Sequence, residues 1–116
     1  MTELSGLRVL IVEDEPVVAM LLEDILEELG CVPVGPANRL SEGLALAEGA
    51  LDAAILDINL AGERSNAIAE LLHARGVPFA FASGYGAPPD GFGAPMIEKP
   101  YRAADIERAL RVILAE

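Results

Sequence analysis

Five residues of this sequence carry groups that could together bind a cation and an anion. They are Glu13, Asp14, Asp57, Ser83 and Lys99. Three carboxylates at one place repel each other unless a cation lies between them, and oxygen ligands with room for water and phosphate suit Mg²⁺. A lysine ammonium beside the metal offers a positive charge to a bound anion, and a serine hydroxyl can donate a hydrogen bond to it. These are the groups needed for phosphoryl transfer onto a carboxylate.

Each of these residues also has a simpler explanation when it is taken singly. Asp57 could cap a helix, and Glu13 and Asp14 could be solvated acids at the start of one. Lys99 could be a surface lysine, and Ser83 a turn residue. The set predicts a site only if the fold brings four separate segments of the chain to one place.

Short apolar runs precede these residues. Residues 53–56 form such a run before Asp57, which is typical of a strand buried on both faces of a parallel sheet. We expect further strands over residues 7–12, 31–35, 78–82 and 95–98. Pro33 in the second strand of the chain favours a position at or near the edge of the sheet.

Amphipathic stretches that predict helices alternate with these runs. We expect one helix to begin near Glu15 and end before Gly30, and others over residues 40–48, 65–75 and 103–114. Asn38 or Ser41 would begin the second helix. In the first helix, the apolar residues assigned to the core are Val18, Met20, Leu21, Leu22, Ile25, Leu26 and Leu29.

Residues 84–95 break this alternation. They contain glycine at 84, 86, 91 and 93 and proline at 88, 89 and 95, so we expect a loop or one helical turn in place of a fourth helix. The pattern predicts a doubly wound α/β domain with a five-stranded parallel sheet in the flavodoxin-like order 2-1-3-4-5. In that order the carboxyl ends of the first, third, fourth and fifth strands lie side by side, which unites the candidate residues.

Composition restricts the classes of function. The chain is long enough for one domain over residues 1–116, and its formal net charge of −11 opposes binding to nucleic acid or anionic membranes. No apolar run reaches the length of a membrane span and the N-terminus does not resemble a signal sequence, so we expect a cytoplasmic protein. Cys31, the single cysteine, lies in an apolar stretch and is assigned to the core.

These motifs, at the ends of these strands, resemble a receiver domain of the two-component response-regulator family over essentially the whole chain. The resemblance implies that Asp57 is the phosphoacceptor. It also implies that Asp14 binds Mg²⁺ or Mn²⁺ directly and that Glu13 helps to position the metal through water. The backbone carbonyl of Asn59 would complete the protein's share of the metal ligands.

The same resemblance assigns roles around the phosphoryl group. Ser83 would bond a phosphoryl oxygen after transfer, and Lys99 would pair with the phosphoryl group, aimed by a cis peptide bond between Lys99 and Pro100. The donor would be a sensor histidine kinase or a histidine phosphotransfer protein. The output would be a contact with a downstream protein, a phosphoryl group passed onward, or a further domain outside this sequence. The chain would catalyse only its own phosphotransfer and dephosphorylation, so it would not be an enzyme in the usual sense.

Residues 81–85 read Phe-Ala-Ser-Gly-Tyr and resemble the receiver subgroup marked by Phe-Ala-Thr-Gly-Tyr, with Ser in place of Thr, and we expect a single-domain receiver. The chain departs from the family at Met96, where many receivers carry a switch Tyr or Phe three residues before the lysine. Without that ring, we expect the segment 84–95 to reorder on phosphorylation, with Gly84 and Tyr85 as part of the signal.

Two other functions account for parts of the pattern. A small Mg²⁺-dependent phosphatase with an aspartate nucleophile would need a general acid and a cap, but the second residue after Asp57 is Asn59 and the chain leaves no room for a cap. A partner-binding pseudo-receiver would not need the charged site residues. His73 is assigned to a solvated position late in its helix, and Tyr101 to packing at the start of the last helix.

Overall fold

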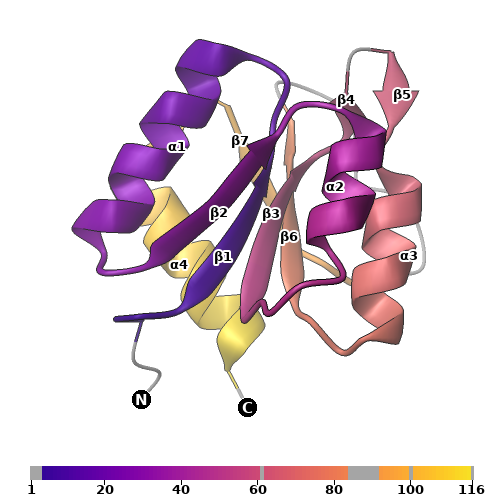
Figure 1. Ribbon diagram of the computed structural model, residues 1–116. Coiled ribbons are helices and arrows are strands. Elements are labelled where there is room, and N and C mark those ends of the chain that lie inside the picture. The colour runs from indigo at the N-terminus through magenta and orange to yellow at the C-terminus, as the bar shows by residue number, and fades with distance from the viewer. Residues whose placement is uncertain (1–3, 61, 84–91, 100, 116) are drawn as a thin grey trace.

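The chain folds into a parallel β-sheet that is covered by helices on both faces (Figure 1). The computed structural model describes residues 4–60, 62–83, 92–99 and 101–115. In chain order the elements are β1 (Arg8–Val12), α1 (Pro16–Glu28), β2 (Val32–Ala37), α2 (Leu40–Leu46), β3 (Ala53–Asp57), β4 (Asn59–Leu60), β5 (Glu63–Arg64), α3 (Asn66–Ala74), β6 (Phe79–Ser83), β7 (Met96–Glu98) and α4 (Ala103–Leu114).

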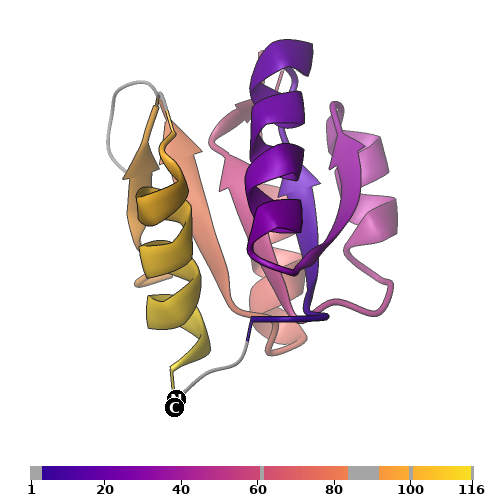
Figure 2. The ribbon, with the colours of Figure 1, turned by 90° about the vertical axis from the view of Figure 1, so that its left-hand side faces the viewer.

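The main sheet has the order β2-β1-β3-β6-β7, and every pairing in it is parallel. This is the predicted order 2-1-3-4-5, because β6 and β7 are the fourth and fifth strands of the main sheet. The strands of this sheet therefore run toward the same end of the molecule, as can be followed in Figure 2. The residues that follow these strands therefore share one edge of the sheet, as the sequence predicts.

The helices cover the sheet in two pairs, α1 with α4 on one face and α2 with α3 on the other (Figure 1). Strand β3 lies at the centre and all five of its residues are buried, which explains its uninterrupted apolar sequence. Pro33 lies in β2, which is an edge strand, as predicted. Gly30 follows the end of α1 with φ 87°, a conformation that favours glycine and ends the helix.

Several local predictions were wrong. Helix α2 begins after Arg39, so neither Asn38 nor Ser41 is its N-cap. Between β3 and α3 the chain forms a two-residue antiparallel ladder, in which Asn59 pairs with Arg64, and the sequence pattern did not predict it. Strands of two residues are too short to show an alternation of apolar and polar residues.

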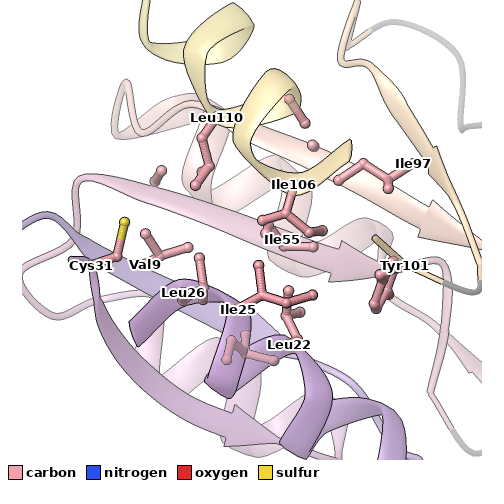
Figure 3. Packing of buried hydrophobic residues seen from close by; sticks show 14 of the residues in the cluster. Val9, Leu22, Ile25, Leu26, Cys31, Ile55, Ile97, Tyr101, Ile106 and Leu110 are labelled. Carbon is pink, nitrogen blue, oxygen red and sulfur yellow. The ribbon is translucent and has the colours of Figure 1, made fainter. Parts of the chain in front are cut away.

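The core on the α1 and α4 face is built from branched apolar residues of both helices and of β1 and β3 (Figure 3). Cys31 is buried among them, as predicted, and its thiol contacts the carbonyl oxygen of Leu4 at 3.3 Å. Met20 and Leu21 are not in this core: they are 62% and 41% exposed. The apolar stripe of α1 is wider than the surface that α4 and the sheet can cover, so its outer residues face solvent.

Residues 92–95, the described part of the glycine- and proline-rich segment, form no helix or strand. Phe92 packs edge-on against Phe79 and Phe81, with ring centroids 5.6 Å and 6.0 Å apart, and against the exposed His73 at 5.8 Å. An aromatic contact therefore covers this part of the sheet. The predicted helical turn at 84–91 lies outside the described residues.

Within the described ranges, none of the helices has the length and apolar character needed to cross a bilayer.

Candidate active site

Four strands of the sheet end at the candidate site. Glu13 directly follows β1, Asp57 is the last residue of β3, Ser83 is the last of β6, and Lys99 directly follows β7. The backbone N–H of Lys99 donates to the carbonyl of Ser83 at 3.0 Å, which extends the pairing of β6 and β7 to the site. The parallel register thus fixes these residues side by side, and the side chains inherit their spacing from the sheet.

Lys99 joins two of the three acids. Its Nζ lies 2.9 Å from Oε1 of Glu13 and 3.0 Å from Oδ2 of Asp57. Burial lowers the pKa of Lys99, but the hydrogen bonds to Glu13 and Asp57 outweigh this effect, and the net pKa is above the usual value. The ammonium is therefore held in its charged form beside the predicted phosphoacceptor.

Glu13 is a buried carboxylate with only 1% of its surface exposed. Burial raises its pKa to about 7, and the charge of Asp57 adds to the rise, while hydrogen bonds from Lys99 and from the backbone N–H of Glu15 oppose it. The group is thus poised between its neutral and charged forms near neutral pH, and an added cation would favour the charged form.

The three acids fit a small oxygen-binding cation. One oxygen from each of Glu13, Asp14 and Asp57 lies within 4.8 Å of the others. Mg–O bonds of about 2.1 Å place oxygens on opposite sides of one ion about 4.2 Å apart, so small side-chain shifts would let the three carboxylates surround it. Asp57 is 7% exposed and Asp14 is half-buried, so the group opens to solvent on one side only.

Asn59 lies next to this group. Its backbone N–H donates to Oδ1 of Asp57 at 3.3 Å, and its side chain is exposed. Because Asn59 bonds to Oδ1 and Lys99 bonds to Oδ2, the two contacts together fix the orientation of the Asp57 carboxylate. The role of the Asn59 carbonyl as a metal ligand stays a prediction.

Comparisons with known proteins agree with this geometry, although no family model matches the chain. The solution structure of SdrG from Sphingomonas melonis Fr1 is 42% identical and has a TM-score of 0.84, and the match covers 99% of this chain and 100% of SdrG. A response regulator receiver domain (CheY-like) from Methylobacillus flagellatus is 27% identical, with a TM-score of 0.80 over 94% of this chain and 99% of that domain. The chain belongs to the response regulator receiver family.

Part of a larger regulator also resembles this receiver. It is 32% identical over 114 residues to the phyllosphere-induced regulator PhyR of Methylorubrum extorquens. The match covers 89% of the receiver, which spans only 42% of the length of PhyR. The similarity therefore concerns one portion of PhyR.

The residues predicted to transmit the signal are placed only in part. Met96 is half-buried and pairs in register with Phe81, on the strand that ends at Ser83. Ser83 is half-buried at the edge of the site. Gly84, Tyr85 and Pro100 lie outside the described residues, and so does the predicted cis bond before Pro100.

The sequence did not predict one member of the receiver's site, the hydroxyl of Tyr101. The ring is buried near the start of α4, as predicted, but the hydroxyl also donates a hydrogen bond to Oε1 of Glu13 at 3.4 Å. Burial raises the pKa of Tyr101 above its usual value, and the charges of Glu13 and Asp57 add to this, so the phenol keeps its proton. The one available signal was a tyrosine, rather than a phenylalanine, at a buried position two residues after Lys99.

Proposed function

We propose that this receiver accepts a phosphoryl group onto Asp57 from the phosphohistidine of a sensor histidine kinase or a histidine phosphotransfer protein. The observation that carries the proposal is that the ammonium of Lys99 contacts both Asp57, at 3.0 Å, and Glu13, at 2.9 Å. These two acids and Asp14 form a cluster that can hold Mg²⁺ or Mn²⁺. A purely structural ion pair would not need a second carboxylate on the same lysine, nor a third acid, Asp14, beside the two.

The transfer would require little covalent chemistry from the protein. A carboxylate oxygen of Asp57 would form a bond to phosphorus while the bond from phosphorus to the histidine nitrogen breaks, leaving a neutral imidazole after protonation. A bound Mg²⁺ would supply positive charge against the phosphoryl oxygens. Lys99 would leave the Asp57 carboxylate to pair with a phosphoryl oxygen, and Ser83 would donate a hydrogen bond to another. Later, a water oxygen would form a bond to phosphorus while the bond from phosphorus to the Asp57 oxygen breaks, which releases inorganic phosphate and restores the carboxylate.

Intact mass tests this proposal directly. The protein is incubated with a small acyl-phosphate donor, in one sample with Mg²⁺ and in another with a chelator. We expect one phosphoryl adduct per chain with Mg²⁺ and a much smaller amount without it, because Lys99 alone cannot balance the charge of three acids and the incoming phosphoryl group. Continuous turnover of a small phosphate ester would instead support the phosphatase function, and absence of any adduct would overturn the proposal.

We further propose that the output is a contact with a downstream protein, in the manner of the Phe-Ala-Thr-Gly-Tyr subgroup. Phe81 and Ser83 are two residues apart on β6 and so point to the same face, where Phe92 packs. Movement of Ser83 toward a phosphoryl group would disturb the contact between Phe81 and Phe92. The ring contact between Phe81 and Phe92 supports a signal carried by residues 84–95. In this proposal Phe92 takes the role of the aromatic switch residue that is absent at Met96.

A fluorescent reporter can detect such a change, because the chain has no tryptophan. We expect Phe92→Trp to give an emission spectrum that shifts when beryllofluoride, a phosphoryl mimic, is added with Mg²⁺. The same addition should leave the spectrum unchanged when Asp57→Ala is combined with Phe92→Trp. An unchanged spectrum in the first protein, despite bound mimic, would exclude a rearrangement at Phe92.

A further inference from the structure

The side chain of Tyr101 lies partly in the hydrophobic core and partly at the acid site. Its ring is 5% exposed and belongs to the buried cluster on the α1 and α4 face, which also contains Leu22 and Ile97 (Figure 3). Its hydroxyl reaches the acid site and donates to Glu13. Packing alone would be served by a phenylalanine, which fills almost the same space without burying a hydroxyl. The hydroxyl therefore requires an explanation of its own.

The hydrogen bond from Tyr101 is one of three that the Glu13 carboxylate accepts. Oε1 accepts hydrogen bonds from Lys99 at 2.9 Å and from Tyr101 at 3.4 Å, and Oε2 accepts one from the backbone N–H of Glu15 at 3.2 Å. Lys99 is shared with Asp57, so a phosphoryl group would attract it away from Glu13, and a metal ion would displace it from the carboxylates. Tyr101 belongs to the core and cannot follow.

We propose that Tyr101 is a positioning residue for the metal site, an inference that rests on the proposed function. Its hydroxyl keeps the Glu13 carboxylate directed toward Asp14 and Asp57 when Lys99 turns to another anion. The buried carboxylate then retains two fixed donors, the phenol and the backbone N–H of Glu15, and does not turn away from the cation. Groups that orient metal-binding carboxylates in this way commonly affect metal affinity when they are replaced.

The test is the affinity for Mg²⁺ alone, measured by titration in the absence of any phosphoryl donor. We expect Tyr101→Phe to weaken Mg²⁺ binding about tenfold, the low end of the range for such partners, because a contact of 3.4 Å is long for a hydroxyl. The thermal midpoint of the metal-free protein should change little, since the ring remains in the core. This second measurement separates lost positioning from poor folding.

A double-mutant cycle shows whether the effect passes through Glu13. In a Glu13→Gln background, Tyr101→Phe should cause no further loss of Mg²⁺ affinity. An equal affinity of wild type and Tyr101→Phe, or the same loss in both backgrounds, would overturn the role of Tyr101 and leave the proposed function intact. If the wild-type protein failed to bind Mg²⁺ at all, the positioning role and the metal part of the proposed function would fall together.

Discussion

Asp57→Asn should reduce the phosphoryl adduct to background, both with a small acyl-phosphate donor and with a phosphorylated histidine protein. The amide oxygen can still accept the hydrogen bond that Asn59 donates to Asp57 at 3.3 Å, so the local backbone is preserved. The amide is not a nucleophile toward phosphorus, and the variant therefore removes the reaction without removing the shape of the site. Intact mass after incubation measures the result.

Two other substitutions make this result specific. Asp24→Asn on the exposed face of α1 removes one negative charge far from the site and should give the wild-type adduct. Asp14→Asn should slow formation of the adduct, and more Mg²⁺ should partly restore the rate, because Asp14 would contribute to the metal and not to the bond. An adduct of full yield in Asp57→Asn would place the phosphoacceptor elsewhere and refute the assignment.

Much of this site could be predicted because the sequence of a parallel α/β domain indicates where each strand ends. A run buried on both faces contains no charge, so the first acid after residues 53–56 marks the end of a strand as well as a reactive group. The known strand order of such sheets then places Lys99 beside Asp57, although 42 residues separate them in the sequence. Topology brings the two residues to one edge of the sheet, and the long side chain of Lys99 spans the intervening strand β6 to reach Asp57.

The features that the sequence did not reveal depend on details of side-chain packing. The exposure of Met20 and Leu21 depends on how much of α1 its neighbours cover, and a helical wheel contains no information on the neighbours. Similarly, the hydroxyl of Tyr101 meets Glu13 across 88 residues of sequence, through a contact that no local pattern encodes. Sequence periodicity therefore predicted the helices and strands, whereas these two features depend on how the elements pack against each other.

Lys99→Ala should lower the stability of the metal-free protein by about 3 kcal/mol. Removing one partner of a buried ion pair costs about 3–5 kcal/mol because the other charge stays buried, and here Glu13 and Asp57 both lose their cation. We expect the lower end of that range, since the side chain of Lys99 is 15% exposed and water can reach the site. Denaturant unfolding with a chelator present measures the loss.

The matched control is Arg111→Ala, which removes an equal charge from an exposed i,i+4 pair with Glu107 on α4 and should cost less than about 0.5 kcal/mol. Adding Glu13→Gln to Lys99→Ala should restore more than half of the lost stability, because the most buried of the charges is then gone. A loss below about 1 kcal/mol in Lys99→Ala would mean that the acids do not depend on the lysine.

The cost of Lys99→Ala should also depend on pH, and the sign follows from Glu13. Its pKa rises from 4.5 to about 7 on folding, so the folded protein binds this proton more tightly than the unfolded chain does. Stability from this group is complete below pH 4.5 and is lost as the pH rises through 7. Without Lys99 the pKa of Glu13 rises further, so the variant should approach the wild type in acid and diverge from it above neutral pH. Added Mg²⁺ should reduce the divergence at high pH, because the cation can take over the charge balance that the lysine provides.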